Sequence, residues 1–234
     1  LQNYAGGIAA YIDGGTRITG CVSRGTINGA DGVGGIVGAC QDTASSLTGC
    51  VNYGAIAADG SSAGAGGIAG RMNGSMTRCA NYGTVTGKVW YLGGLAGSCN
   101  TDKGGVITGC YNIGAVTSTS TYGSAGTGGL IGYGNYYRLQ NCYDYGTVTA
   151  AKGTTGAIVG RDSRRSYSSR QRCYYLTGAC ANASNNAAQE TNVEAISAAA
   201  FASDAFAGRL NEGLTSAAFA QAGNHASGDK DVFD

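Results

Sequence analysis

Residues 66–87 read GGIAGRMNGSMTRCANYGTVTG, and this stretch sets the pattern for most of the chain. It opens with a Gly pair and a branched aliphatic residue and runs through a variable segment to a Cys. It then closes with an Asn, a Gly and a β-branched residue. Short β-branched stretches separated by Gly are typical of short strands joined by turns. The unit therefore predicts strands and no helix.

The same unit recurs along the chain at steps of 28, 32, 27, 35 and 28 residues. Its opening Gly pairs are Gly6-Gly7, Gly34-Gly35, Gly66-Gly67, Gly93-Gly94 and Gly128-Gly129, with a degenerate opening at Gly156-Ala157. A fixed period of about 30 residues with about three short strands indicates one coil of a solenoid. We therefore predict an all-β fold, a parallel β-solenoid (β-helix) of about six coils over residues 1–179, with coils stacked about 4.8 Å apart.

The repeat also resembles a known family. The segments GGIAG at 66–70 with CANYGTVTG at 79–87, and GGLAG at 93–97 with CYNIGAVTS at 110–118, are similar to the GLUG-motif repeat. The resemblance covers residues 5–178. It implies an extracellular solenoid without catalytic residues, of the kind found in secreted or cell-surface bacterial proteins, including non-catalytic regions of immunoglobulin A-cleaving metallopeptidase-like proteins.

The composition narrows the class of protein. The chain has 43 Gly, no Pro, 12% charged residues and a net charge of +1, which argues against nucleic-acid binding. It contains no apolar run long enough to span a membrane, so we expect no membrane insertion. No leader is visible before the first Gly pair, so we expect the chain to be cut from a longer precursor with flanking domains.

The cysteines occupy repeat positions. Six of the nine stand at one position of the unit and are expected to form a structural ladder: Cys21, Cys50, Cys79, Cys110, Cys142 and Cys173. Stacked thiols are small hydrophobes, although the spacing also permits disulfides. Cys40 and Cys99 share a second inward position, and Cys180 follows the last coil. With one His and no C-x-x-C motif, neither a zinc site nor any other cofactor is expected.

Two groups of side chains are candidates for binding a partner. Aromatic residues gather around the middle coils, and such rings stack on sugars or anchor proteins, unless they shield the coil corners. They are Trp90, Tyr91, Tyr122, Tyr133, Tyr136 and Tyr137. Arginines gather in the last coil, where they would contact an anionic glycan or a partner's carboxylates, or form a solvated edge paired with the acidic tail. They are Arg161, Arg164 and Arg165, with Arg170 and Arg172 nearby.

Enzyme motifs are weak in this chain. The stretch 60–64 matches G-x-S-x-G but lies in a Gly/Ala/Ser loop rather than a strand-turn-helix setting. The Asp residues at 13, 42, 102 and 162 are scattered in turns, and Thr84-x-Thr86 forms no continuous Thr array. No catalytic residue is therefore expected, although acidic side chains clustered on one solvent face would favour a glycan-cleaving β-helix.

The composition changes after Cys180, so residues 180–234 are expected to be a linker and a helical cap. Thr191-Asn192-Val193-Glu194 fits a capping box, Ser203-Asp204 starts a second helical pattern that ends at Gly213, and residues 216–222 form a third. An open solenoid end needs a cap, so the helices should cover the coil near Cys173.

Together these observations predict a non-enzymatic extracellular structural or adhesion module of a larger bacterial surface protein. Its partner would be an extracellular protein or glycan that the sequence does not identify. Two alternatives stay open: a glycan-binding module that uses the loop aromatics, and a glycan-cleaving β-helix.

Overall fold

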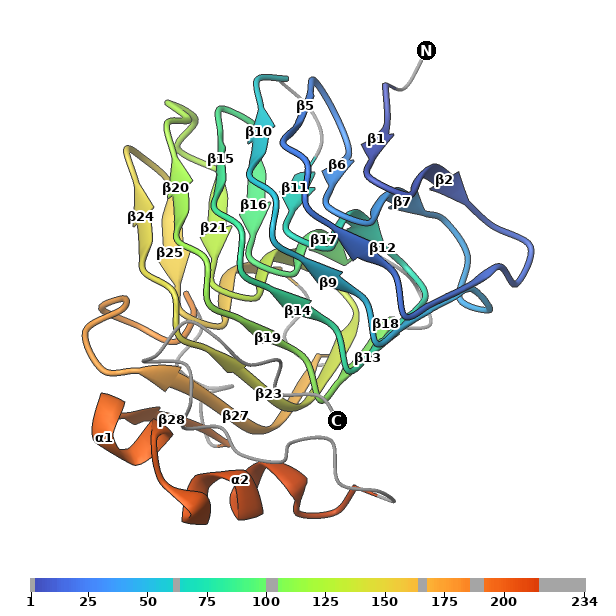
Figure 1. Cartoon of the computed structure of the whole chain (residues 1–234). Coiled ribbons are helices and arrows are strands. Elements are labelled where there is room, and N and C mark those ends of the chain that lie inside the picture. Colours follow the sequence, from blue (N-terminus) through green and yellow to red (C-terminus); the bar gives the residue numbers. More distant parts are fainter. Residues whose placement is uncertain (1–2, 61–63, 100–104, 164–167, 186–191, 215–234) are drawn as a thin grey trace.

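A computed structural model describes residues 3–60, 64–99, 105–163, 168–185 and 192–214. Short parallel strands stack in register into a solenoid, and two short helices follow near the C-terminus (Figure 1). The predicted fold class is confirmed. No helix in the described ranges is long and apolar enough to cross a membrane.

Each winding passes through four sheets, which we name A to D in the order in which the chain meets them. Sheet A contains β1 (Ala5–Gly6), β6 (Val33–Gly34), β11 (Gly64–Gly66), β16 (Tyr91–Gly93), β21 (Gly126–Gly128) and β25 (Thr154–Gly156). Sheet B contains β2 (Ala9–Ile12), β7 (Val37–Cys40), β12 (Ala69–Met72), β17 (Ala96–Cys99), β22 (Ile131–Gly134) and β26 (Val159–Asp162). The six strands in each of these sheets correspond to the six Gly-pair blocks of the sequence.

Sheet C bends at the Cys position. Before the bend lie β3 (Arg17–Thr19), β8 (Ser46–Thr48), β13 (Ser75–Thr77) and β18 (Gly105–Thr108). After it lie β4 (Val22–Ser23), β9 (Val51–Asn52), β14 (Ala80–Asn81) and β19 (Tyr111–Asn112), whereas β23 (Tyr137–Asp144) and β27 (Ser169–Leu176) run through it. Sheet D contains β5 (Ile27–Gly29), β10 (Ile56–Ala58), β15 (Val85–Gly87), β20 (Val116–Ser118) and β24 (Val148–Ala150).

The expected three strands per coil are therefore too few, and the bend in sheet C is one reason. The residue immediately before each Cys of the ladder has a positive φ between 50° and 63°, in the left-handed region. These six residues are Gly20, Gly49, Arg78, Gly109, Asn141 and Arg172. A left-handed residue interrupts an extended strand and turns the chain. The corner therefore has a backbone cause that recurs in every winding.

Two apolar clusters fill the windings. One is formed by the inward residues of sheets B and C and includes Ile68, Met76 and the Cys ladder. The other is formed by sheets A and D and includes Val33, Leu92 and Val116. Vertical files of apolar side chains therefore supply the interior, as the repeat predicts.

The Gly pair and the Asn of the repeat fit one another between these clusters. A Cβ on Gly67 would lie 2.1 Å from Cγ of Asn81, and a Cβ on Gly94 would lie 2.2 Å from Cγ of Asn112. The second Gly of the pair is therefore needed to admit the buried amide, which explains why the Gly pair accompanies Asn52, Asn81 and Asn112.

The first winding has no neighbour over its outer edge in the described chain. Ile8 is 46% exposed, whereas its repeat equivalents Ile36 and Ile68 are fully buried. Val22 is likewise 46% exposed, and its neighbour in the next winding, Val51, is buried. The apolar repeat positions thus become interior only when another winding covers them.

The C-terminal region differs from the predicted linker and helices. Residues 182–184 continue the stack, because Ala157 and Ile158 donate backbone hydrogen bonds to Asn182 and Ala183. Residues Val193–Ile196 form strand β28, parallel to β27, in place of the first part of the helix that the capping-box pattern predicts, and only the end of that pattern is helical, at Ala198–Phe201. Thr191 lies outside the described residues. Pairing with a free strand edge stabilises this segment more than an N-cap would stabilise a short isolated helix.

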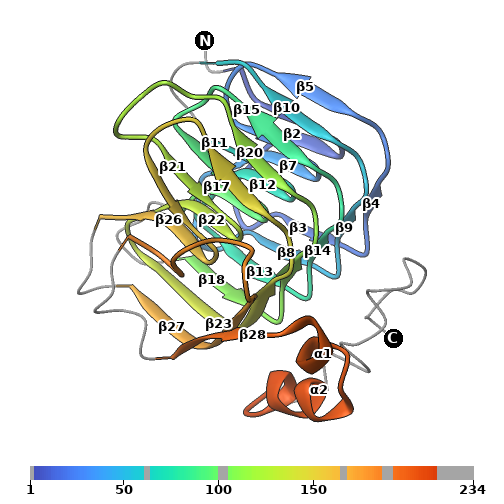
Figure 2. The ribbon, with the colours of Figure 1, turned by 90° about the vertical axis from the view of Figure 1, so that its left-hand side faces the viewer.

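The two helices that follow are α1 (Ala198–Phe201) and α2 (Asp204–Asn211), so the second predicted helix is confirmed. They lie beside β28, outside the outline of the windings (Figure 2). Phe201, Phe206 and Leu210 pack against Tyr143 and Tyr174 of sheet C. The helices therefore cover the outer face of sheet C rather than the coil of Cys173. That coil is covered by β28, in which Val193 pairs with Cys173. The third predicted helical run, residues 216–222, lies outside the described residues.

Candidate functional site

The cysteine ladder lies in the core as predicted. All nine cysteines are free thiols, and the ladder residues stack from one winding to the next. The Cys50 amide donates to Sγ of Cys79 (3.4 Å), and the Cys79 amide donates to Sγ of Cys110 (3.2 Å). Burial raises the pKa of the Cys99 thiol to about 12 and also raises the pKa of Cys110 and Cys173. These buried thiols are therefore poor nucleophiles, because the reactive form is the thiolate.

Beside the thiols runs a ladder of buried amides. Nδ2 of Asn52 donates to Oδ1 of Asn81, Nδ2 of Asn81 to Oδ1 of Asn112, and Nδ2 of Asn112 to Oδ1 of Asp144, each at 2.8 Å. Each of the three amides also donates to the carbonyl two residues later in its own winding. The ladder holds windings together and exposes no group to solvent.

Tyr137 and the last-coil arginines are placed differently from the prediction. Tyr137 is fully buried, so it is not a partner-binding residue. Its hydroxyl donates to Oδ2 of Asp162 (2.9 Å), and the Arg170 guanidinium donates to the same Oδ2 (2.7 Å). Arg170 occupies the repeat position that Leu139 holds in the previous winding, so its cation points inward. The Asp162 carboxylate and the Tyr137 hydroxyl contact this buried cation. These residues form a buried polar cluster rather than a binding surface.

The other arginines do not gather on one surface. Nη1 of Arg161 donates to the carbonyl of Ser124, and Arg172 lies 3.6 Å from the Glu212 carboxylate at the end of α2. Arg164 and Arg165 lie outside the described residues. Of the predicted arginines in the described ranges, Arg161 lies near Tyr91, and Arg170 lies over the buried Tyr137 ring.

Four of the predicted aromatic residues do form a cluster, which we call the aromatic row: Tyr122, Trp90, Tyr91 and Tyr133. The rings of Trp90 and Tyr122 lie 5.4 Å apart, Trp90 and Tyr91 meet edge-on at 6.2 Å, and Tyr91 stacks on Tyr133 at 4.5 Å. Burial raises the pKa of Tyr91, with Tyr133 adding to this effect and Arg161 opposing it. Tyr136 lies in the bend between β22 and β23 and is half-buried.

Local backbone structure positions two members of the row, Tyr91 and Tyr122. Tyr91 begins β16, and its partners in sheet A are Gly64 and Gly126, which leave room for its ring to reach Tyr133 on sheet B. Tyr122 lies in the loop after β20, where its amide donates to Oγ of Ser120 and its carbonyl accepts from the Ala125 amide. Tyr122 is 41% exposed, so the row opens to solvent at this end.

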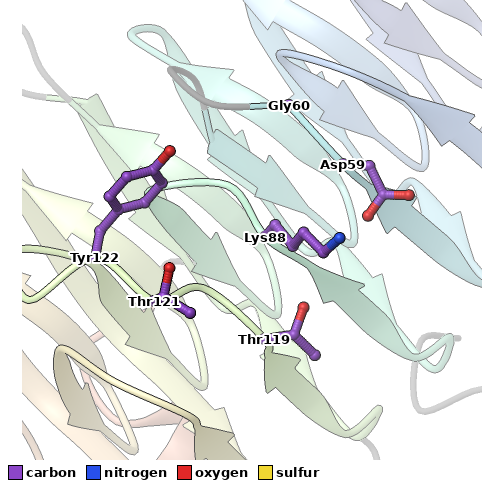
Figure 3. Close-up of a pocket in the computed structure, with 6 residues that line it drawn as sticks. All are labelled: Asp59, Gly60, Lys88, Thr119, Thr121 and Tyr122. Atoms are coloured by element: carbon purple, nitrogen blue, oxygen red, sulfur yellow. The ribbon is translucent and has the colours of Figure 1, made fainter.

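A pocket of about 360 Å³ adjoins Tyr122 on the D-to-A corner, where the loops from sheet D to sheet A lie. It is lined by Asp59, Gly60, Lys88, Thr119, Thr121 and Tyr122, which come from three consecutive windings (Figure 3). In the figure Tyr122 stands at one side, and the Lys88 side chain extends toward Asp59 at the other. The volume is at the lower end of the range for small-ligand sites.

Strand register aligns the polar residues of this pocket. Asp59, Lys88 and Thr119 each follow the last residue of a sheet D strand, and those last residues pair with one another. Their amides donate to the preceding winding at 2.9–3.1 Å, which fixes the file along the solenoid axis. All three are exposed, and none belongs to the three ion pairs found in the described residues. Sequence reasoning missed them, and aligning the residue after each sheet D strand would have revealed them.

The acidic residues weighed for a glycan-cleaving enzyme are dispersed. Asp42 accepts hydrogen bonds from Ser45 within its own turn, which lower its pKa. Asp162 is buried against Arg170, Asp13 is exposed in the turn after β2, and Asp102 lies outside the described residues.

No protein-family model, curated protein or solved structure gives a significant match to this chain.

Proposed function

We propose that the chain is a non-enzymatic structural and adhesion module that acts outside the cell as part of a larger bacterial surface protein. The observation that carries this proposal is that recurring and variable residues of the repeat lie in different places within each winding. The recurring Gly, Asn, Cys and aliphatic residues are used in contacts between windings, whereas residues that differ between units lie in the loops, and those of three windings meet on the D-to-A corner.

The arrangement suits display. Parallel windings in register make a rigid stack, and loops of variable length at one corner present side chains from several windings together. The aromatic row and the adjoining pocket are such a surface, because Tyr122, Lys88 and Asp59 come from three windings. The resemblance to the GLUG-motif repeat agrees with an extracellular scaffold and remains a prediction.

Adhesion is tested by coupling the folded chain to inert beads and counting the beads that remain on cultured epithelial cells under flow. Beads that carry heat-unfolded chain are the control. We expect retention above this control. Equal retention of both bead types would contradict the adhesion function.

The extracellular location and the absence of catalysis need their own measurements. Antibodies to the chain should label intact bacteria that express the whole protein, and labelling only after permeabilisation would contradict surface display. Incubation with soluble polysaccharides should release no reducing ends, and sustained release by the purified chain would contradict the non-enzymatic assignment.

A further inference from the structure

Deepening the adhesion function proposed above, and resting on it, we propose that the pocket beside Tyr122 binds a neutral oligosaccharide. The Tyr122 ring would stack on a sugar ring, and Asp59, Lys88 and the two threonines would bond its hydroxyl groups. Among the described residues, these five side chains and the backbone of Gly60 line the pocket.

The pocket joins the two kinds of group that a sugar ring needs. A pyranose has apolar C–H faces and a rim of hydroxyl groups, so an aromatic face and a few polar side chains complement it. Tyr122 supplies the face, and its contact with Trp90 holds the ring in place. The Asp59 carboxylate accepts hydrogen bonds, and the Lys88 ammonium donates them. The Thr121 hydroxyl does both, whereas the Thr119 hydroxyl donates to the Gly87 carbonyl at 3.3 Å and accepts from the ligand.

The charges favour a neutral ligand over an anionic one. Lys88 has Asp59 as its neighbour in the adjacent winding, and Figure 3 shows the Lys88 side chain extending toward that carboxylate. An anion placed against Lys88 would also face Asp59, so the attraction and the repulsion would largely cancel.

The exposure of the site favours a glycan over a protein partner. The centre of a protein interface is an apolar, desolvated pocket from which charged residues are depleted. Here Asp59, Lys88, Thr119, Thr121 and Tyr122 are all exposed. The residue after the sheet D strand is polar in three consecutive windings, as Asp59, Lys88 and Thr119, so this polar file follows the axis over three windings and suits an extended ligand laid along it.

The chain reports on this site directly, because Trp90 is its only tryptophan and touches Tyr122. The experiment is a titration of the whole chain, followed by tryptophan fluorescence. The probes are hexamers of β-1,4-linked glucose, xylose and mannose and of α-1,4-linked glucose, with oligogalacturonate as an anionic comparison. We expect at least one neutral hexamer to give a saturable change with a dissociation constant below about 1 mM.

Variants then locate the binding. Tyr122→Ala should weaken it by about tenfold, Asp59→Asn and Lys88→Met by about threefold or more each, and Tyr122→Phe by less than about threefold. Tyr11→Ala is the matched control, since Tyr11 is 46% exposed and lies on sheet B in the first winding, and it should change the affinity by less than about twofold. Circular dichroism checks that each variant is folded.

Three results would overturn the inference: no neutral hexamer perturbs Trp90, Tyr122→Ala binds as tightly as the parent chain, or oligogalacturonate binds more tightly than every neutral probe. Bead adhesion distinguishes this failure from that of the proposed function. Adhesion that survives both Tyr122→Ala and periodate oxidation of the cell surface would exclude the sugar site and retain the adhesion function. Loss of adhesion on periodate treatment, with the same loss in Tyr122→Ala, would support the sugar site.

Discussion

Asn112 donates its side-chain amide to Oδ1 of Asp144 at 2.8 Å, and with this bond a ladder of buried amides ends on a carboxyl group. Burial raises the pKa of Asp144 well above its ordinary value, while the bonds from Asn112 and the Gly146 amide oppose this shift. Its other oxygen, Oδ2, is buried without a hydrogen-bond partner among the described residues. The last rung is therefore the least satisfied one.

Replacing Asp144 with Asn should stabilise the protein at neutral pH. Folding raises the pKa of this carboxyl, so above about pH 4 the folded protein retains a proton that the unfolded chain releases. The free energy of unfolding of the parent chain therefore falls as pH rises from that point. Asp144→Asn should remove this slope and gain about 1–3 kcal/mol at pH 7. Urea unfolding between pH 4 and pH 8 measures both effects, and a parallel pH dependence in the two proteins would contradict the assignment.

Two glycines at one repeat position should lose very different amounts of stability on the same substitution. A Cβ on Gly83 would lie 1.9 Å from the carbonyl oxygen of Gly54 in the preceding winding, whereas a Cβ on Gly25 meets nothing within 4 Å. Gly83→Ala should cost about 3 kcal/mol or more, because both the winding and its neighbour must shift. Gly25→Ala should change stability by less than about 1 kcal/mol. Thermal unfolding of the two variants tests this contrast, and similar losses would show that close stacking is not the cause.

Removing Arg170 alone should lower the free energy of unfolding more than removing its charge together with that of Asp162. Arg170→Leu restores the residue type of Leu139 but leaves the Asp162 carboxylate buried without its cation, which should cost about 3–5 kcal/mol. Arg170→Leu combined with Asp162→Asn removes both charges and should recover most of this loss. A double-mutant cycle by urea unfolding gives the coupling energy. Additive losses would mean that the pair does not act as a unit.

The thiols should react in two classes. Cys21 and Cys180 are half-buried, and the other seven cysteines are buried. Excess maleimide at pH 7 should label only these two within minutes, and the remainder should react at the rate at which the protein unfolds. Mass spectrometry of peptides from the quenched reaction identifies the labelled positions. Rapid labelling of Cys79 or Cys110 would show that the core between sheets B and C opens easily.

The sequence predicts the stack well because its signals are local and repeated. Cys79, Asn81 and Gly83 recur at fixed offsets, and residues at one offset must lie above one another in any fold built of equal windings. Tyr137 was misjudged for the opposite reason, since its partners Asp162 and Arg170 are specific to the last windings and follow no repeat.

The errors near the C-terminus and the missed pocket residues have a different physical origin. The pattern at Val193 and Glu194 satisfies the rules of a helix start, but the open edge of β27 offers a full row of backbone partners. The alignment of Asp59, Lys88 and Thr119 depends on strand pairing across loops of unequal length. Local propensity contains neither kind of information, because both arise from tertiary contacts.

The register of sheet A also determines how the molecule should respond to a mechanical pull. Residues that pair between neighbouring strands of this sheet are separated along the chain by 28, 32, 27, 35 and 28 residues; they are Ala5, Val33, Ala65, Leu92, Thr127 and Thr155. A force along the axis loads the contacts between two neighbouring windings at a time, so the stack should peel rather than rupture as a whole. An atomic force microscope would then record a sawtooth trace whose extension steps, about 90–125 Å each, follow those unequal lengths.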